Sequence, residues 1–307
     1  MFCKVLPEGL PKSVANACAR KYAATATVRR RRARWLVCCI VAGWLASACG
    51  GSRVRADAIA AAAQFDRATV QGTQFAHLIY SAAAGDSSAP LWVYIEGDGV
   101  PWIDQTIPSR DPTPRALVAL AMMTRGPGPA VYLGRPCYFG TAERSPCEPV
   151  WWTHRRFGPE VVSSMVSALD RIVDQKSWNH RPINLVGFSG GGTLATLMAA
   201  RTKNVCALIT VASPLDIDEW AASHDYSPLA GSGNPAVLPA LRGGIRQLHL
   251  RGGRDKLVSQ DNGIEFRRRN PAARFRVVAN VDHGYAWVDV WDELLRRKTE
   301  PAIADCL

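Results

Sequence analysis

The chain has 307 residues, 48% hydrophobic and 21% charged, which is the composition of an ordinary globular protein with enough apolar residues for one sizeable core. Its formal net charge of +11 does not indicate nucleic-acid binding, because the first 48 residues hold nine of the basic side chains and a single acid. The remaining residues carry 28 basic and 25 acidic side chains, so the excess charge belongs to the N-terminal leader.

Residues 1–48 have the order of an export signal. A basic cluster, Arg29–Arg34, precedes the apolar run Trp35–Ala48, whose 14 residues fall short of the ~20 that cross a bilayer as a helix. The residues LASAC, ending at Cys49, resemble a bacterial lipobox, whose cysteine is lipidated and becomes the first mature residue. We therefore expect an exported protein, held in the periplasm or at the outer membrane by a lipid on Cys49. Cleavage after Ala48 to give a secreted protein and an uncleaved membrane tether are the alternatives.

The cysteines are compatible with export. If Cys49 carries lipid, four of the nine cysteines remain outside the leader, and an even number in an oxidising compartment predicts two disulfides. Cys137 and Cys147 flank a loop with Gly140 and Pro146, so we expect that pair to be bonded, which leaves Cys206 and Cys306 as the second pair. Four buried free thiols are the alternative. No Cys and His spacing predicts a zinc site.

Strands and helices alternate after the leader. Residues 49–64 are Ala-rich and predict an N-terminal helix or a tether, and one domain is expected over residues 65–307, with a candidate lid or rim loop at 221–239. Apolar runs bounded by turn residues predict strands at Gln74–Ser81, Leu91–Ile95, Ala130–Leu133, Ile183–Val186, Cys206–Val211, Ile245–Leu250 and Phe275–Ala279. One helix is predicted to start at Thr113, with the Thr113 hydroxyl as its cap and Pro114 in its first turn. Further helices are predicted at Glu160–Val173, Thr193–Ala200 and Tyr285–Arg297. This alternation predicts an α/β fold with a mostly parallel sheet covered on both faces.

The residues GFSGG at 187–191 form a G-x-S-x-G pattern between a predicted buried strand and a predicted helix. A serine on so sharp a turn leaves no room for side chains two positions before or after it, which explains the glycines. We therefore expect Ser189 to be a nucleophile. A Gly-rich turn with an ordinary serine is the alternative, and a phosphate-binding loop is disfavoured because no Gly-Lys-Ser or Gly-Lys-Thr follows.

A serine nucleophile needs a general base that is itself oriented by a carboxylate. A sharp strand-to-helix turn that carries a nucleophile is called a nucleophile elbow. In enzymes with such an elbow, the acid follows the serine along the chain and the histidine follows the acid. His283 follows the last predicted strand, at the edge where catalytic groups gather, and is the expected base. Asp255, in a GGRD turn after another strand, is the expected acid, and Asp216 or Asp218 after the preceding strand are its competitors.

The negative charge that develops on the substrate oxygen requires two backbone N–H donors. Gly190, directly after the nucleophile, is the first expected donor. The second is expected in the EGDG segment after the Leu91–Ile95 strand, from Asp98 or, next in order, Gly97. Farther along, His154–Arg156 is predicted to be a solvated basic turn, and a segment that attracts an anionic group is the alternative.

The elbow at Ser189, the GGRD turn at Asp255, the DHG at His283 and the strand-borne EGDG together resemble the α/β-hydrolase superfamily from about Phe65 to the C-terminus. The resemblance implies a sheet of about eight strands and acyl transfer through an acyl-Ser189 intermediate that water then hydrolyses. It implies no metal or organic cofactor and does not identify the substrate. Because an exported hydrolase meets esters in or outside the cell envelope, we expect a small acyl ester as the substrate and carboxylesterase or lipase-like activity. A peptidase, thioesterase or acyltransferase of the same fold, and a non-catalytic envelope lipoprotein that uses the scaffold for binding, are the alternatives.

Overall fold

The computed structural model describes residues 51–82 and 88–297. The described residues from Ser52 onward belong to one compact unit, and the description below concerns this unit. The predicted leader, the lipidation site Cys49 and the predicted disulfide partner Cys306 lie outside the described residues. Within those residues, no helix combines the length and apolar character that crossing a membrane requires.

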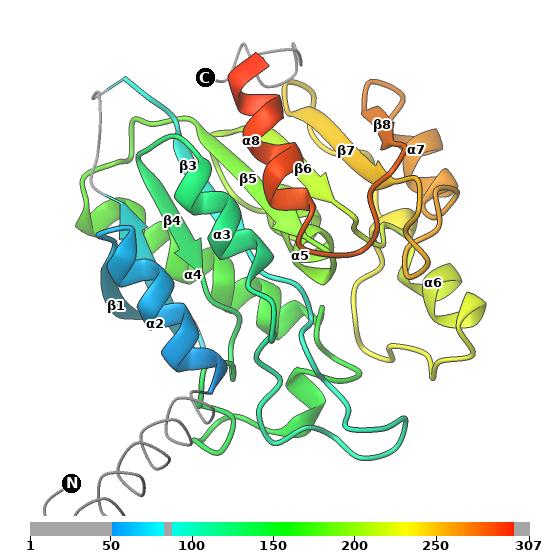
Figure 1. The fold of residues 1–307 in the computed structure, drawn as a ribbon, viewed down its shortest axis with the longest axis horizontal. Coiled ribbons are helices and arrows are strands. Elements are labelled where there is room, and N and C mark those ends of the chain that lie inside the picture. The colour runs from blue at the N-terminus through cyan, green and yellow to red at the C-terminus, as the bar shows by residue number, and fades with distance from the viewer. Residues whose placement is uncertain (1–50, 83–87, 298–307) are drawn as a thin grey trace, which may run out of the picture. The chain divides into compact units, whose positions relative to one another are not determined.

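The centre of this unit is a sheet of eight strands in the order β1-β2-β4-β3-β5-β6-β7-β8 (Figure 1). The strands are β1 (Asp66–Gln71), β2 (Ala76–Ala82), β3 (Leu91–Ile95), β4 (Ala130–Leu133), β5 (Ile183–Phe188), β6 (Val205–Val211), β7 (Arg246–Gly252) and β8 (Arg274–Val278). β2 pairs antiparallel with β1 and with β4, and every other neighbouring pair is parallel. The prediction of a mostly parallel sheet of about eight strands is therefore confirmed.

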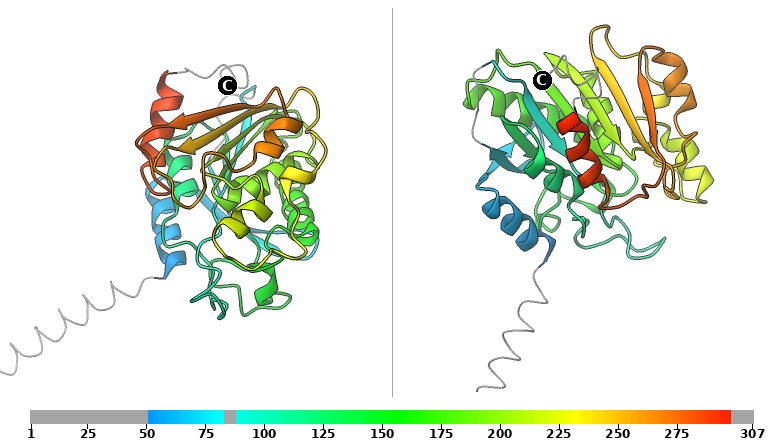
Figure 2. Two further views of the ribbon diagram at one scale, coloured as in Figure 1. Left: turned by 90° about the vertical axis from the view of Figure 1, so that its right-hand side faces the viewer. Right: turned by 45° about the horizontal axis from the view of Figure 1, so that its top comes forward.

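Helices cover both faces of the sheet, so its central strands β3 and β5 are buried along their whole length (Figure 2). One face carries α2 (Ser52–Ala62), α3 (Val118–Arg125) and α8 (Trp287–Arg297), which pack in sequence against one another. The other carries α4 (Pro159–Gln175) and α5 (Gly190–Ala199). The remaining helices are α6 (Ile217–Ser223), α7 (Ile264–Arg269) and the 3₁₀ turns η1 (Pro149–Trp151) and η2 (Pro235–Val237).

The Ala-rich segment after the leader is a helix in the structure. Ala56 and Ala60 of α2 are buried, and Asp57 accepts a hydrogen bond from the Tyr80 hydroxyl at 2.7 Å. The sequence left open whether this segment is a helix or a tether, and the structure shows a helix over Ser52–Ala62.

The predicted helix start at Thr113 is wrong, because α3 begins at Val118. The Thr113 hydroxyl donates to Asp111 Oδ1 and accepts from the N–H of Phe139, so it links two loops instead of capping a helix. The N-terminus of α3 is capped from elsewhere in the chain: Glu96 accepts hydrogen bonds from the N–H groups of Ala119 and Leu120. A distant cap of this kind leaves no local sequence signal.

The segments that carry the expected site residues leave the sheet at one edge. β3 to β8 are mutually parallel, so their carboxyl ends lie together. The loops that follow β3, β5, β7 and β8 contain Asp98, Ser189, Asp255 and His283, respectively. This edge is therefore where the site has to be sought.

Candidate active site

Ser189 stands on a sharp turn between β5 and α5. Its backbone has φ of 52° and ψ of −130°, a conformation that non-glycine residues rarely adopt. A Cβ on Gly187 would lie 2.3 Å from the carbonyl oxygen of Gly191, and one on Gly191 would lie 2.2 Å from that of Ile95. Neither position has room for a side chain, so the two outer glycines of the G-x-S-x-G pattern are sterically required.

His283 joins Ser189 to Asp255. Its Nε2 lies 2.9 Å from Ser189 Oγ and its Nδ1 lies 2.8 Å from Asp255 Oδ2. Burial alone would raise the pKa of Asp255, but hydrogen bonding and attraction to His283 outweigh it and hold that pKa below its usual value. An ionised carboxylate only accepts hydrogen bonds, so Nδ1 carries the imidazole proton and Nε2 is left to accept from the Ser189 hydroxyl.

The loops that carry Asp255 and His283 are joined to each other. Arg254 N–H donates to the carbonyl of Val281 at 2.9 Å, and Gly253 N–H donates to that of Val278 at 2.8 Å. A Cβ on Gly253 would lie 2.3 Å from the carbonyl oxygen of Ala279, so the GGRD turn needs glycine at this position to pack so closely. Asp255 Oδ1 accepts from the N–H groups of Leu257 and Val258, which orients Oδ2 toward His283.

Three solved structures show what this arrangement is similar to. An esterase of Pyrococcus furiosus is 16% identical with a TM-score of 0.51, over 77% of this chain and 92% of its own. A protein of unknown function from Agrobacterium tumefaciens, classed with the α/β hydrolases, is 14% identical with a TM-score of 0.51, over 76% and 96% of the two chains. An acylaminoacyl peptidase of Pyrococcus horikoshii is 12% identical with a TM-score of 0.51, over 76% of this chain and 41% of its own.

The chain has the α/β-hydrolase fold. No model of a known protein family and no curated protein sequence matches it. At these identities the likeness extends to the fold alone, so what the site can do has to be argued from its own residues.

In this α/β-hydrolase fold the EGDG segment after β3 lies directly against the elbow. A Cβ on Gly97 would lie 3.2 Å from Cβ of Ser189, and one on Gly190 would lie 2.0 Å from Asp98 Oδ1. Of the two predicted second donors, Gly97 N–H already donates to Glu96 Oε1 at 3.3 Å. Among the residues that the structure describes, neither Asp98 N–H nor Gly190 N–H has a protein acceptor, so these two donors are available beside Ser189.

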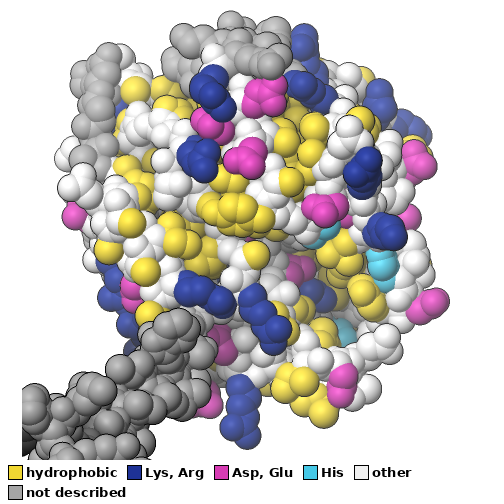
Figure 3. Space-filling model, viewed as in Figure 1, with side chains coloured by type: hydrophobic (Ala, Val, Ile, Leu, Met, Phe, Trp, Pro, Cys, Tyr) yellow, Lys and Arg dark blue, Asp and Glu magenta, His cyan; other side chains and the backbone are white. Residues whose placement is uncertain are grey.

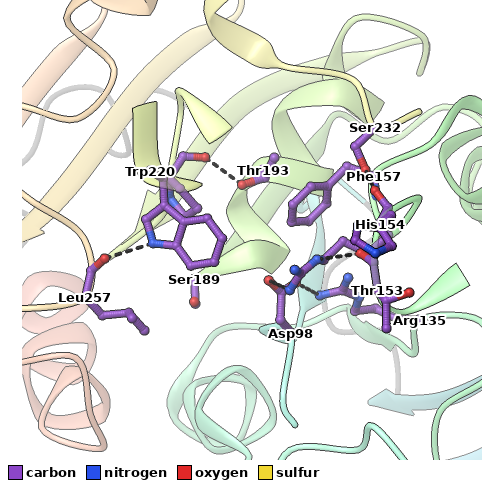
Figure 4. A network of polar contacts seen from close by, with 12 residues as sticks. Asp98, Arg135, Thr153, His154, Phe157, Ser189, Thr193, Trp220, Ser232 and Leu257 are labelled. Atoms are coloured by element: carbon purple, nitrogen blue, oxygen red, sulfur yellow. Dashed lines mark hydrogen bonds and ion pairs between the residues drawn. The ribbon is translucent and has the colours of Figure 1, made fainter. Parts of the chain in front are cut away.

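Two arginines that the sequence did not single out as site residues hold the Asp98 side chain. Arg135 Nη1 donates to Asp98 Oδ1 (Figure 4). Arg156 Nη1 donates to Asp98 Oδ2 at 2.9 Å. Arg156 is only 5% exposed, so the predicted solvated basic turn at 154–156 is wrong at this position, because the guanidinium packs inward onto an acid. The available signal for Arg135 was a charged residue two positions after a predicted strand, at the edge of the sheet that carries the site. The inward orientation of Arg156 has no such signal in the sequence.

The residues around this network line a hollow. Figure 4 shows the indole of Trp220 and the side chain of Leu257 on one side of Ser189 and Asp98 with Arg135 on the other; Trp220 Nε1 donates to the Leu257 carbonyl at 2.9 Å. The space-filling view shows acidic, basic and histidine side chains recessed together on this face (Figure 3). The candidate lid, residues 221–239, reaches this region, since the N–H of Phe157 donates to Ser232 Oγ and the N–H of Gly233 to the Phe157 carbonyl.

The competing acids have other roles. Asp216 Oδ1 accepts from the N–H groups of Asp218 and Glu219 and so caps α6, while Asp218 accepts from the Asn234 amide. Neither is a hydrogen-bond partner of His283 among the residues described. The structure therefore brings Ser189, His283 and Asp255 together and leaves Asp216 and Asp218 in structural positions.

The structure joins Cys137 to Cys147 in a disulfide with a Cα–Cα distance of 5.5 Å. Cys206 also has a bonded partner, but its predicted one, Cys306, is not among the described residues, so that pairing stays a prediction.

Over residues 51–82 and 88–297, no group of three or more His, Cys, Asp or Glu side chains is placed to hold a metal ion.

Proposed function

We propose that the protein is a serine hydrolase that cleaves carboxylic esters through an acyl-serine intermediate. The single observation that carries the proposal is the continuous hydrogen-bonded chain from Ser189 Oγ through His283 to Asp255, in which the two distances are 2.9 and 2.8 Å. Nucleophile, base and orienting acid are each within the reach that proton transfer requires before any substrate binds.

The geometry supports the following reaction. His283 Nε2 takes the proton of the Ser189 hydroxyl as Oγ attacks the ester carbonyl, and the negative charge on the carbonyl oxygen is stabilised by the N–H groups of Gly190 and Asp98. The imidazolium then gives its proton to the leaving alkoxide as the carbon–oxygen bond breaks. A water molecule, deprotonated by His283, attacks the acyl-serine by the same route and releases the acid.

Active-site labelling tests this proposal. A fluorophosphonate probe is expected to label the wild-type protein, and the label should be lost in Ser189→Ala and strongly reduced in His283→Ala. Ser227→Ala, which removes an exposed hydroxyl, is the matched control and should label like the wild type. A wild-type protein that stays unlabelled, or a label that survives Ser189→Ala, would contradict the proposal and favour a non-catalytic scaffold.

Turnover separates esters from the other acyl substrates. Nitrophenyl acyl esters are expected to be hydrolysed with a burst of nitrophenol equal to the enzyme concentration if the acyl-enzyme accumulates. Peptide nitroanilides and acyl thioesters are the comparison substrates. Faster cleavage of the amide than of the ester, measured as kcat/KM, would assign the protein to the peptidases instead.

We also propose that the protein is exported and anchored through lipid at Cys49. The order of basic cluster, apolar run and lipobox-like LASAC supports this proposal, and so does the Cys137–Cys147 disulfide, since disulfides persist mainly in oxidising compartments. Palmitate labelling in cells should be lost in Cys49→Ala and retained in Cys38→Ala. Wild-type protein that takes up no label would leave secretion as the explanation of the leader.

A further inference from the structure

Asp98 is held at every polar atom except its N–H. Its carboxylate oxygens accept from Arg135 Nη1 and Arg156 Nη1, and its carbonyl oxygen accepts from the Tyr138 hydroxyl at 2.9 Å. Its N–H has no acceptor among the described residues. A peptide fixed on both sides of one free donor is prepared to receive an acceptor that is not part of the protein.

Both arginine side chains that hold Asp98 are buried. The side chain of Arg135 is 1% exposed, and its guanidinium lies 5.1 Å from the ring centroid of Tyr138 and 5.6 Å from that of Phe157. Within the described part of the chain, Asp98 is its hydrogen-bond acceptor, and Nε and Nη2 have none. Because burying a guanidinium with unmade hydrogen bonds is costly, its presence here indicates a purpose served through Asp98.

Charge gives a second reason for the arginines. A carboxylate packed against Gly190 would repel the negative oxygen that forms beside Ser189. Burial alone would raise the pKa of Asp98, but attraction to Arg156 and Arg135 outweighs it and keeps the pKa lowered, so the carboxylate stays ionised and paired. The two arginines therefore offset the negative charge of the Asp98 carboxylate next to the N-terminus of α5, where the helix dipole is also positive.

We infer that Arg135, Arg156 and Tyr138 are positioning residues that hold the Asp98 peptide so that its N–H completes the oxyanion hole beside Ser189. The inference rests on the proposed function and extends it to three residues that do not touch the substrate. They come from the segment that follows β4 and from the loop before α4.

Substitutions of graded severity test the inference. Tyr138→Phe removes one hydroxyl without changing the shape of the ring, Arg156→Lys keeps the charge without the guanidinium fork, and Arg156→Gln removes the charge. Since loss of one oxyanion donor costs about 100- to 1000-fold in kcat, we expect displacement of that donor to lower kcat by about 10-fold in Tyr138→Phe and about 100-fold in Arg156→Gln, with Arg156→Lys between the two. KM should stay within about twofold because the substrate carbonyl gains these hydrogen bonds mainly in the transition state.

Inhibition by a trifluoromethyl ketone distinguishes a positioning role from a purely structural one, because a purely structural role would leave its inhibition constant, Ki, unchanged. The ketone adds to Ser189 as a tetrahedral adduct whose oxygen is negative, so its Ki should rise across the variants in proportion to the loss of kcat/KM. Arg155→Gln and Tyr132→Phe are the matched controls: Arg155 is half-exposed and pairs with Glu160, and the Tyr132 hydroxyl has no hydrogen-bond partner among the described residues. Both are expected to leave kcat and Ki unchanged.

The outcomes distinguish this inference from the proposed function. Wild-type hydrolysis together with unchanged kcat and Ki in all three variants would overturn the positioning role and leave the hydrolase intact. So would a loss of kcat that only follows a loss of folded protein, measured by circular dichroism and Tm. A wild-type protein that neither hydrolyses esters nor binds the ketone would overturn both.

Discussion

Asp255 uses both carboxylate oxygens, and each has a separate task. Oδ1 is held by the N–H groups of Leu257 and Val258, and Oδ2 accepts from His283 Nδ1. Asn at this position would keep the first pair of hydrogen bonds through its carbonyl oxygen, but its NH₂ group would face Nδ1. The imidazole would then have to accept at Nδ1 and carry its proton on Nε2, where it cannot deprotonate Ser189.

We therefore expect Asp255→Asn to fold like the wild type and to lower kcat by about 10⁴-fold, the loss that a reversed tautomer produces in serine hydrolases. Asp261→Asn is the control, because Asp261 is exposed on the same loop. Steady-state hydrolysis of a nitrophenyl ester measures both variants. A loss below about 10-fold in Asp255→Asn would mean that another carboxylate orients His283.

The turn from β5 to α5 depends on close backbone contact with the end of β3. A Cβ on Gly191 would meet backbone carbonyl oxygens of Ile95 and Glu96 at 2.2 and 2.5 Å, and backbone cannot move aside as a flexible side chain can. We expect Gly191→Ala to lower the free energy of unfolding by about 3 kcal/mol through overpacking. Gly243→Ala, with nothing within 4 Å of the new Cβ, should change it by less than about 0.5 kcal/mol. Urea denaturation measures both, and equal midpoints would contradict the steric argument.

The cap of α3 makes stability depend on pH. Burial raises the pKa of Glu96 to about 7, with the hydrogen bonds from Ala119, Gly97 and Leu120 opposing the shift. Between pH 4.5, the pKa of Glu96 in the unfolded chain, and about pH 7, its pKa in the folded chain, the folded state binds more protons than the unfolded state. The contribution of Glu96 to the free energy of unfolding is therefore present at low pH and is lost as pH rises through about 7. Relative to Glu96→Gln, we expect the wild type to lose about 3 kcal/mol of unfolding free energy between pH 5 and 8. Urea titrations of both proteins across this range measure the difference, and a constant difference would contradict the assignment.

The elements that the sequence predicted well are those with a local signal. β3 and β4 are continuously buried and were predicted with the bounds that they have. β1 was missed because it is an edge strand with one buried residue, Val70, so its sequence shows no apolar alternation. α6, which begins before the candidate lid and overlaps only its first residues, was missed, although Asp216 is a standard capping residue in front of it.

The parallel arrangement of the strands explains how much of the site was predictable. Ser189, Asp255 and His283 each follow a predicted strand, and the rule that carboxyl ends of parallel strands share an edge is enough to bring them together. The support for Asp98 was not predictable in the same way. Arg156 reaches it from a loop whose path depends on packing across the chain, such as the hydrogen bond from Ser232 to the His154 carbonyl at 2.7 Å.

The Cys137–Cys147 disulfide links the stability of the unit to its site. It closes a loop that contains Tyr138 and begins two residues after Arg135, both of which hold Asp98. Closing a loop of this length is worth about 3 kcal/mol by restricting the unfolded chain. We expect the double variant Cys137→Ala/Cys147→Ala to lower Tm by about 6–12 °C. Its kcat at 25 °C should also fall while KM holds, because the loop that positions Tyr138 is no longer closed. Scanning calorimetry and ester hydrolysis measure the two effects, and a variant with wild-type kcat but reduced Tm would show that the disulfide stabilises the unit without supporting Asp98.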